Sequence, residues 1–199
     1  FLLGIEFTDC EIGDGENVGL YYAATAHSRD VTFNNSVFYN NTNYNIYMYP
    51  DNIIEHLQFN NCSISYSKYG VYFAGSPAGV VYDNLQFNNT AILNHAFEGV
   101  YFTGPNYDGR QMGIQFNNCT ITHNGTSSAN TYSNVHFDST MAALSSGSGH
   151  VPVWFINTFI GDSYSYNGTL YPKYGLNINS SVPQTYIKDG EVKDNVSGV

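Results

Sequence analysis

An eight-residue pattern of alternating apolar and polar positions recurs along the chain. Close copies are "VTFNNSVF" (31–38), "LQFNNCSI" (57–64), "LQFNNTAI" (85–92) and "IQFNNCTI" (114–121), with "IEFTDCEI" (5–12) before them and "VWFINTFI" (153–160) after them. A second motif follows as "GLYY" (19), "NIYM" (45) and "GVYF" (70 and 99), and later as "NVHF" (134) and "GLNI" (175). Such alternation is typical of half-buried β-strands.

The spacing of these copies predicts a stacked repeat. The octapeptides start 26, 26, 28, 29 and 39 residues apart, and a period of about 20–50 residues indicates a repeat architecture. Each unit reads as strand, turn, strand, loop and strand, and the abundance of Tyr, Phe and Gly favours strands and turns over helices. Helical repeats are therefore excluded, and a propeller blade would need about 40 residues. We predict an all-β solenoid with parallel pairing between coils.

Each repeat position becomes a row of side chains in such a solenoid, with about 4.8 Å between coils. Four apolar rows are expected to face inward. They are Ile5/Val31/Leu57/Leu85/Ile114/Val153, Phe7/Phe33/Phe59/Phe87/Phe116/Phe155, Ile12/Phe38/Ile64/Ile92/Ile121/Ile160 and Leu20/Ile46/Val71/Val100/Val135/Leu176. A fifth row, Asp9/Asn35/Asn61/Asn89/Asn118/Asn157, is expected at a turn, because Asn tolerates left-handed backbone angles and stacks its amides.

These features resemble the right-handed parallel β-helix repeats of the pectate-lyase-like superfamily, in which an apolar strand, an Asn or Cys at a tight turn and a Gly-Ile/Val strand also recur. The resemblance covers roughly residues 4–182. It implies a right-handed single-stranded parallel β-helix of about six to seven coils over 1–182, with 183–199 as a C-terminal strand or tail. That superfamily holds lyases, hydrolases, epimerases, phage tailspikes, adhesins and inert surface proteins, so the fold leaves the function open.

The charge balance narrows the range of partners. The net charge is −10, so nucleic acid is not an expected partner, because no basic patch could neutralise several phosphates. Polyanionic sugars would be repelled too unless a bound cation intervened. No run approaches the roughly 18 apolar residues of a membrane span. Glycosylation sequons at Asn40, Asn124, Asn167 and Asn195 suit an extracellular or cell-surface glycoprotein.

The three cysteines, Cys10, Cys62 and Cys119, share one register in alternate coils. This places them about 9.6 Å apart, beyond the roughly 7 Å Cα separation that a disulfide allows. We therefore predict three free, buried thiols. No Cys-x-x-Cys or His-x-x-x-His spacing is present, and neither a metal nor a cofactor is expected.

The outward rows carry the candidate binding residues. Tyr21, Tyr47, Tyr72 and Tyr101 share a register with His136. A flat tyrosine stripe suits stacking on sugar rings or contact with another protein copy. The alternative is that the tyrosine pairs only stabilise an exposed sheet.

A catalytic site has weaker support. Asp108, Arg110, Asp138 and His136 belong to nearby coils, with Glu98 beside them, and a cluster of the four is geometrically possible. No paired-Asp and His-Gly motif, Asp-Pro-His-Asp motif or nucleophile elbow accompanies them.

Three functions remain open. The first is an extracellular structural or adhesive solenoid without enzymatic activity. Because no capping helix is apparent, we expect it either to stack end to end into a filament or to be part of a larger surface or fibre protein. The second is a polysaccharide lyase or glycoside hydrolase. The third is a glycan-binding module that uses the tyrosine row.

Overall fold

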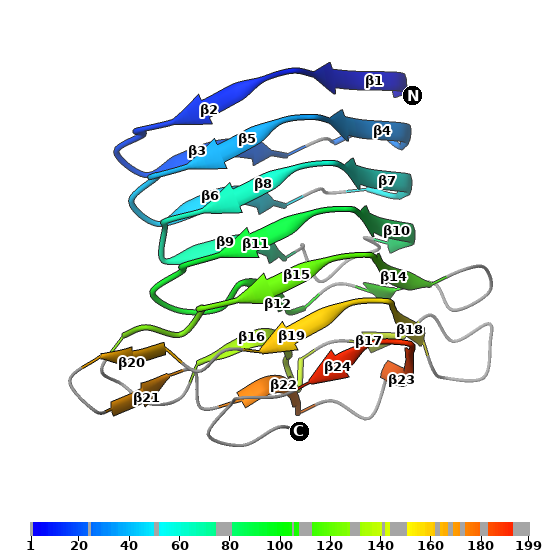
Figure 1. Cartoon of the computed structure of the whole chain (residues 1–199). Coiled ribbons are helices and arrows are strands. Elements are labelled where there is room, and N and C mark those ends of the chain that lie inside the picture. The colour runs from blue at the N-terminus through cyan, green and yellow to red at the C-terminus, as the bar shows by residue number, and fades with distance from the viewer. Residues whose placement is uncertain are drawn as a thin grey trace.

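The described residues form a stack of coils built from strands and turns (Figure 1). The computed structural model describes residues 2–23, 25–49, 52–74, 81–104, 106–107, 113–127, 132–140, 142–143, 151–161, 164–166, 169–171, 174–179 and 183–192. Within these ranges no helix is long and apolar enough to cross a membrane.

Three parallel sheets run along the stack, and each coil adds one strand to each of them. Sheet A contains β1 (Leu2–Thr8), β4 (Ser28–Asn34), β7 (Ile54–Asn60), β10 (Val81–Asn88), β14 (Ile114–Asn117), β18 (Val151–Ile156) and β23 (Pro183–Lys188), with short additions β13 (Asn106–Tyr107) and β17 (Ala142–Ala143). Sheet B contains β2 (Glu11–Gly13), β5 (Val37–Tyr39), β8 (Ser63–Ser65), β11 (Ala91–Leu93), β15 (Thr120–Thr122), β19 (Phe159–Gly161) and β24 (Glu191–Val192). Sheet C contains β3 (Val18–Tyr22), β6 (Tyr44–Met48), β9 (Tyr69–Phe73), β12 (Val100–Phe102), β16 (Ser133–Phe137) and β22 (Tyr174–Ile178).

One element departs from the parallel pattern. The strands β20 (Tyr164–Tyr166) and β21 (Thr169–Tyr171) pair antiparallel with each other as a separate hairpin. In Figure 1 this hairpin projects from the side of the stack, beyond sheets B and C.

The stack continues beyond the boundary predicted at residue 182. β23 pairs in parallel with β18 over six residues, and β24 pairs with β19. Residues 183–192 are therefore the start of a further coil. The described strands thus form six coils that contribute to all three sheets and the beginning of a seventh, which agrees with the predicted coil number.

The predicted inward rows form the core. From the second coil onward, every member of the four apolar rows is buried. In the first coil Ile5, Phe7, Ile12 and Leu20 are only partly buried. The phenylalanines of sheet A stack face to face from Phe7 to Phe155, with ring centroids 4.8–4.9 Å apart and planes within 10° of parallel. The ring spacing equals the coil spacing, so each ring keeps the next coil in register.

A single left-handed residue turns the chain from sheet A into sheet B. Asn35, Asn61, Asn89, Asn118 and Asn157 all have φ between 48° and 55°, as predicted for this row. Two amide contacts link members of the row: Asn61 Nδ2 donates to Asn35 Oδ1 at 3.3 Å, and Asn157 Nδ2 donates to Asn118 Oδ1 at 2.8 Å.

The more continuous amide ladder lies one residue earlier, on the outer surface of sheet A. Asn60, Asn88 and Asn117 each donate through Nδ2 to the Oδ1 atom of the preceding coil, at 3.0, 2.8 and 2.8 Å, and the series begins at Asn34. In the octapeptide, therefore, the first Asn forms the outer ladder and the second Asn forms the turn.

Thiols alternate with hydroxyls in the cysteine row, which contains Cys10, Ser36, Cys62, Thr90, Cys119 and Thr158. The structure holds three free cysteines, of which Cys62 and Cys119 are buried. Cys10 lies in the first coil and is only half-buried, so the prediction of three buried thiols is wrong for this residue. The hydroxyls of Ser36, Thr90 and Thr158 accept hydrogen bonds from the backbone N–H groups of the cysteines in the preceding coils.

Candidate functional site

The outer face of sheet C carries a continuous aromatic surface. Tyr21, Tyr47, Tyr72 and Tyr101 are register partners on neighbouring coils, and His136 follows them in the same row. Adjacent ring centroids lie 5.4, 5.2, 5.0 and 4.8 Å apart along this row. The predicted register of the four tyrosines and His136 is therefore confirmed.

A second tyrosine row, absent from the sequence-based prediction, lies beside the first. Tyr44 stacks on Tyr69 at 5.2 Å, and both contact Tyr72. The reason is local: β6 and β9 each bury two consecutive residues, so the residues three apart both face outward. The spacing Tyr-x-x-Tyr in "YNIYM" and "YGVYF" was the available signal.

The tyrosine surface is interlocked and not the flat stripe that was expected. The ring of Tyr72 stands at 80° to Tyr44, 88° to Tyr69 and 69° to Tyr101. Burial raises the pKa of Tyr72 to about 12, and it also raises the pKa values of Tyr47 and Tyr69. The rings therefore cover much of one another, and the surface presents ring edges and hydroxyl groups.

The aromatic surface opens at its N-terminal end. Tyr21 is 55% exposed, and a hollow beside it is lined by Asn17, Val18, Tyr21, Tyr44 and Tyr47. An apolar hollow with a few amide and hydroxyl groups is the usual form of a small-molecule subsite.

Two acidic groups, Asp138 and Glu98, lie at the opposite end of the tyrosine row. The hydroxyl of Tyr101 donates to Asp138 Oδ2 at 2.8 Å, and Asp138 Oδ1 accepts from Thr140 N at 2.9 Å and Thr140 Oγ1 at 2.7 Å. Burial alone would raise the pKa of Asp138, but these hydrogen bonds and the nearby His136 hold it below its ordinary value. Asp138 is thus an anion that accepts three hydrogen bonds, which makes it a weak base and a good anchor for the turn at Thr140.

The imidazole of His136 bridges two coils. Its Nδ1 lies 3.3 Å from Glu98 Oε1, and its Nε2 lies 3.2 Å from Asn179 Nδ2. Nδ1 donates to the carboxylate of Glu98, and Nε2 is paired with the side-chain amide of Asn179. The Glu98 side chain is 6% exposed. The cluster therefore joins the segment before β12, β16 and the residue after β22, and it leaves Glu98 Oε2 buried without a hydrogen-bond partner.

The other two predicted catalytic residues, Asp108 and Arg110, lie outside the described residues. Among the residues that the structure describes, no group of three or more His, Cys, Asp or Glu side chains has the arrangement of a metal site.

The predicted glycosylation sites divide into three cases. Asn40 is exposed, and its Nδ2 donates to Asp14 Oδ1 at 2.9 Å. Asn124 is fully buried, and its Nδ2 donates to Ile92 O and Asn134 Oδ1. A glycan on Asn124 is incompatible with this fold, so that prediction is wrong, because a polar side chain at a turn also serves to satisfy buried backbone. Asn167 and Asn195 lie outside the described residues.

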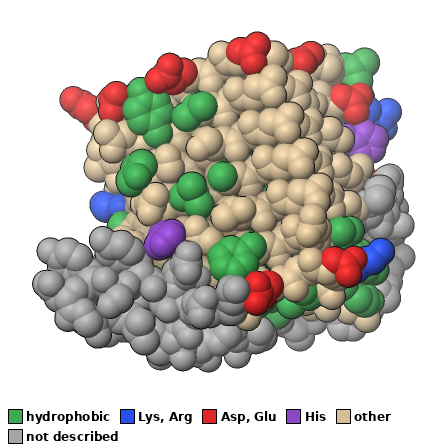
Figure 2. All heavy atoms as spheres, viewed as in Figure 1, with side chains coloured by type: hydrophobic (Ala, Val, Ile, Leu, Met, Phe, Trp, Pro, Cys, Tyr) green, Lys and Arg blue, Asp and Glu red, His purple; other side chains and the backbone are tan. Residues whose placement is uncertain are grey.

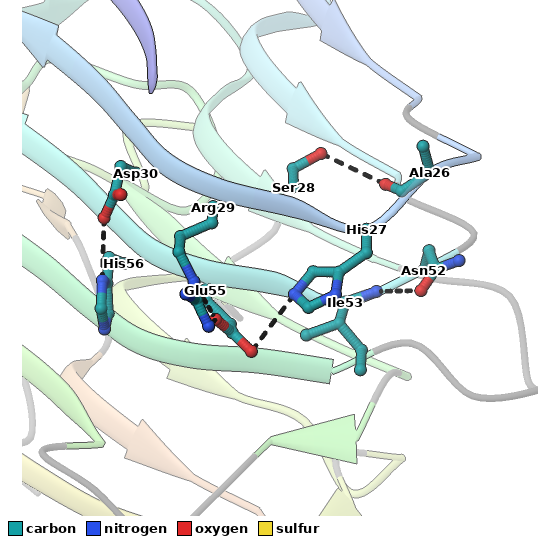
Figure 3. Close-up of polar contacts among 9 residues, drawn as sticks. All are labelled: Ala26, His27, Ser28, Arg29, Asp30, Asn52, Ile53, Glu55 and His56. Carbon is teal, nitrogen blue, oxygen red and sulfur yellow. Dashed lines mark hydrogen bonds and ion pairs between the residues drawn. The ribbon is translucent and has the colours of Figure 1, made fainter. Parts of the chain in front are cut away.

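Figure 2 shows few charged side chains over the middle of sheet B and several acidic ones along the first coil, where Asp9, Glu11, Asp14 and Glu16 are exposed. At the start of the sheet A strands, Glu55 contacts both His27 and Arg29, and Asp30 contacts His56 (Figure 3). The cation of Arg29 is thus already paired within the protein.

Fold and surface together define a right-handed parallel β-helix with an aromatic outer face. The sequence matches the family described as "Right handed beta helix region" over residues 4–189, and the chain belongs to that family. No curated protein and no solved structure matches the chain.

Proposed function

We propose that the protein is an extracellular, adhesive β-solenoid that contacts a neutral glycan through the aromatic face of sheet C. The observation that carries this proposal is the two-row tyrosine surface, which spans four consecutive coils and borders an open hollow at Tyr21 and Tyr47. Tyrosine combines an apolar ring with a polar tip, which matches the mixture of C–H and hydroxyl groups on a sugar.

The charge of the chain supports a neutral ligand. A net charge of −10 opposes binding of polyanionic polysaccharides, and Arg29 is already engaged with Glu55. The exposed sequon at Asn40 is compatible with a glycosylated protein outside the cell.

Binding to a panel of immobilised neutral polysaccharides tests the proposal. The variants Tyr47→Ala and Tyr72→Ala are expected to weaken binding about tenfold or more, as loss of a central aromatic contact residue does at other binding surfaces. Tyr66→Ala is the matched control, because Tyr66 is 58% exposed on a turn outside the aromatic surface. If Tyr47→Ala and Tyr72→Ala lower the unfolding midpoint and leave binding at the level of Tyr66→Ala, the tyrosines serve only the sheet.

A polysaccharide-active enzyme is the second candidate, supported by the contact between Glu98 and His136 at the end of the same face. Release of reducing or unsaturated sugars from the panel, lost in Glu98→Gln, would favour this alternative. Association between copies, which belongs to the adhesive proposal, is measured in parallel by sedimentation velocity over a range of protein concentrations.

A further inference from the structure

A second hollow lies on a different side of the coil stack, on the outer surface of sheet A. It is lined by Gln115 of β14, Trp154 and Ile156 of β18, and Lys188 of β23. Gln115 and Trp154 are register partners, as are Ile156 and Lys188. Three successive coils therefore contribute to one site.

The hollow lies where the outer amide rows of sheet A end. The Asn ladder runs from Asn34 to Asn117, and the next position is Ile156. Isoleucine has no amide, so the side-chain Oδ1 of Asn117 receives no ladder hydrogen bond from the following coil. The neighbouring glutamine row likewise changes from Gln115 to Trp154.

An aromatic pair forms the wall of the hollow. The ring of Tyr186 stacks on Trp154 with centroids 4.2 Å apart and planes 14° from parallel. Tyr186 therefore supports one face of the indole and fixes its orientation, because Trp154 and Tyr186 are also backbone partners. A rigid aromatic ring beside amide groups and an ammonium group combines a surface for sugar C–H groups with donors and acceptors for sugar hydroxyls.

We propose that this hollow binds one pyranose ring of a neutral glycan. The ring packs on Trp154 and Ile156, while Lys188 and the amide of Asn117 hydrogen-bond its hydroxyl groups. A neutral sugar is favoured over an acidic one because a single lysine in a chain of net charge −10 does not offset the repulsion of a polyanion. The site is independent of the proposed function, since it lies on sheet A and the tyrosine surface lies on sheet C.

The tryptophan itself provides the measurement, because Trp154 is the only tryptophan in the chain. Soluble oligosaccharides of glucose, mannose and galactose are titrated into the full chain while the tryptophan emission is recorded. We expect a saturable change in emission with at least one of the three. Lys188→Ala should weaken it roughly tenfold, the loss expected for a hydrogen bond to a charged group.

Two further variants make the test specific. Ile156→Asn continues the amide ladder into the hollow and should abolish the response while the chain remains folded. Tyr72→Ala, on sheet C, should leave the response unchanged even where it abolishes binding to the polysaccharide panel. If the tryptophan emission does not change with any of the three sugars, the proposed site is wrong. The same conclusion follows from a change that Lys188→Ala and Ile156→Asn leave intact, or from one that follows protein concentration and not sugar concentration.

Discussion

The imidazole of His95 packs directly against the backbone of Gly70, so closely that a methyl group on Gly70 would lie 2.7 Å from His95 Nε2 and would also collide with Gly99 O. His95 is fully buried at the turn between sheets B and C. Its Nε2 lies 3.1 Å from Ile64 O, and its Nδ1 lies 3.0 Å from Ser67 Oγ. One histidine thus links two coils.

The same contact between a turn side chain and a glycine explains why glycine stands first in "GLYY" (19) and "GVYF" (70 and 99). A methyl group on Gly19 would meet the amide of Asn41, and one on Gly99 would meet the amide of Asn124, at 2.5 and 2.7 Å. A large turn residue therefore faces a glycine on the adjacent strand. Where the motif carries asparagine, at Asn45, the amide instead donates to Ser65 O at 2.7 Å.

Replacing Gly70 by alanine should be strongly destabilising. The substitution places a methyl group against a buried backbone carbonyl, and overpacking of this kind costs about 2–3 kcal/mol. Urea unfolding measures the change. A second variant, Gly70→Ala with His95→Ser, should recover part of the loss, because serine occupies the equivalent position at Ser67. A loss below about 0.5 kcal/mol for the single variant would contradict the packing.

Acid should destabilise the protein through His95. Burial lowers the pKa of His95 from its ordinary value of 6.5 to about 4. His95 binds a proton less readily in the folded state than in the unfolded state. Its contribution to stability is therefore constant above about pH 6.5 and falls as the pH is lowered from there towards 4. The loss at pH 5 should be roughly 2 kcal/mol.

The variant His95→Asn is the control for this effect, because asparagine stands at the equivalent turn positions Asn41 and Asn124. Its stability should depend less on pH between 6.5 and 5. Equal acid sensitivity in both proteins would assign the effect to other groups.

Removing the hydroxyl of Tyr101 should raise the pKa of Asp138. That hydroxyl donates to Asp138 Oδ2, and it is one of the groups that hold the pKa of this carboxyl below its ordinary value. Titration of the carboxyl by NMR in Tyr101→Phe should show the higher pKa. Thr140→Val, which removes another donor, should act in the same direction, and an unchanged pKa in both variants would exclude these hydrogen bonds as the cause.

The three thiols should differ in reactivity. Cys10 is half-buried, while Cys62 and Cys119 are buried, and burial raises the pKa of Cys119 to about 11. Because the thiolate is the reactive form, a thiol reagent at pH 8 should modify Cys10 first and the other two only on unfolding. Cys10→Ser should remove the fast phase, and rapid modification of all three native thiols would contradict the fold.

The phenylalanine stack should contribute more to the stability of the fold in its middle than at its start. Phe87 is fully buried between Phe59 and Phe116, and Phe87→Ala should cost about 3–5 kcal/mol. Phe7 is only partly buried, so Phe7→Ala should cost clearly less. Urea unfolding of both variants measures the difference, and equal losses would show that the first coil is as tightly packed as the centre.

The coil and its inward rows could be predicted from the amino-acid pattern. A strand has a side-chain period of two and each coil must repeat the same corner, so Phe, Asn and the Cys/Ser/Thr row were readable from spacing alone. The same reasoning located the outward tyrosines Tyr21, Tyr47, Tyr72 and Tyr101, because their register follows from the repeat.

The departures from simple alternation depend on contacts between coils, which the pattern does not show. Two consecutive buried residues in β6 and β9 bring Tyr44 and Tyr69 to the outer face, and this could not be read from a period of two. Asn124 carries a sequon but is buried by contacts with Ile92 and Asn134, which come from another coil and another strand. Whether a polar side chain at a turn faces water or the interior depends on the coil stacked beside it, and that neighbour exists only after the chain has folded.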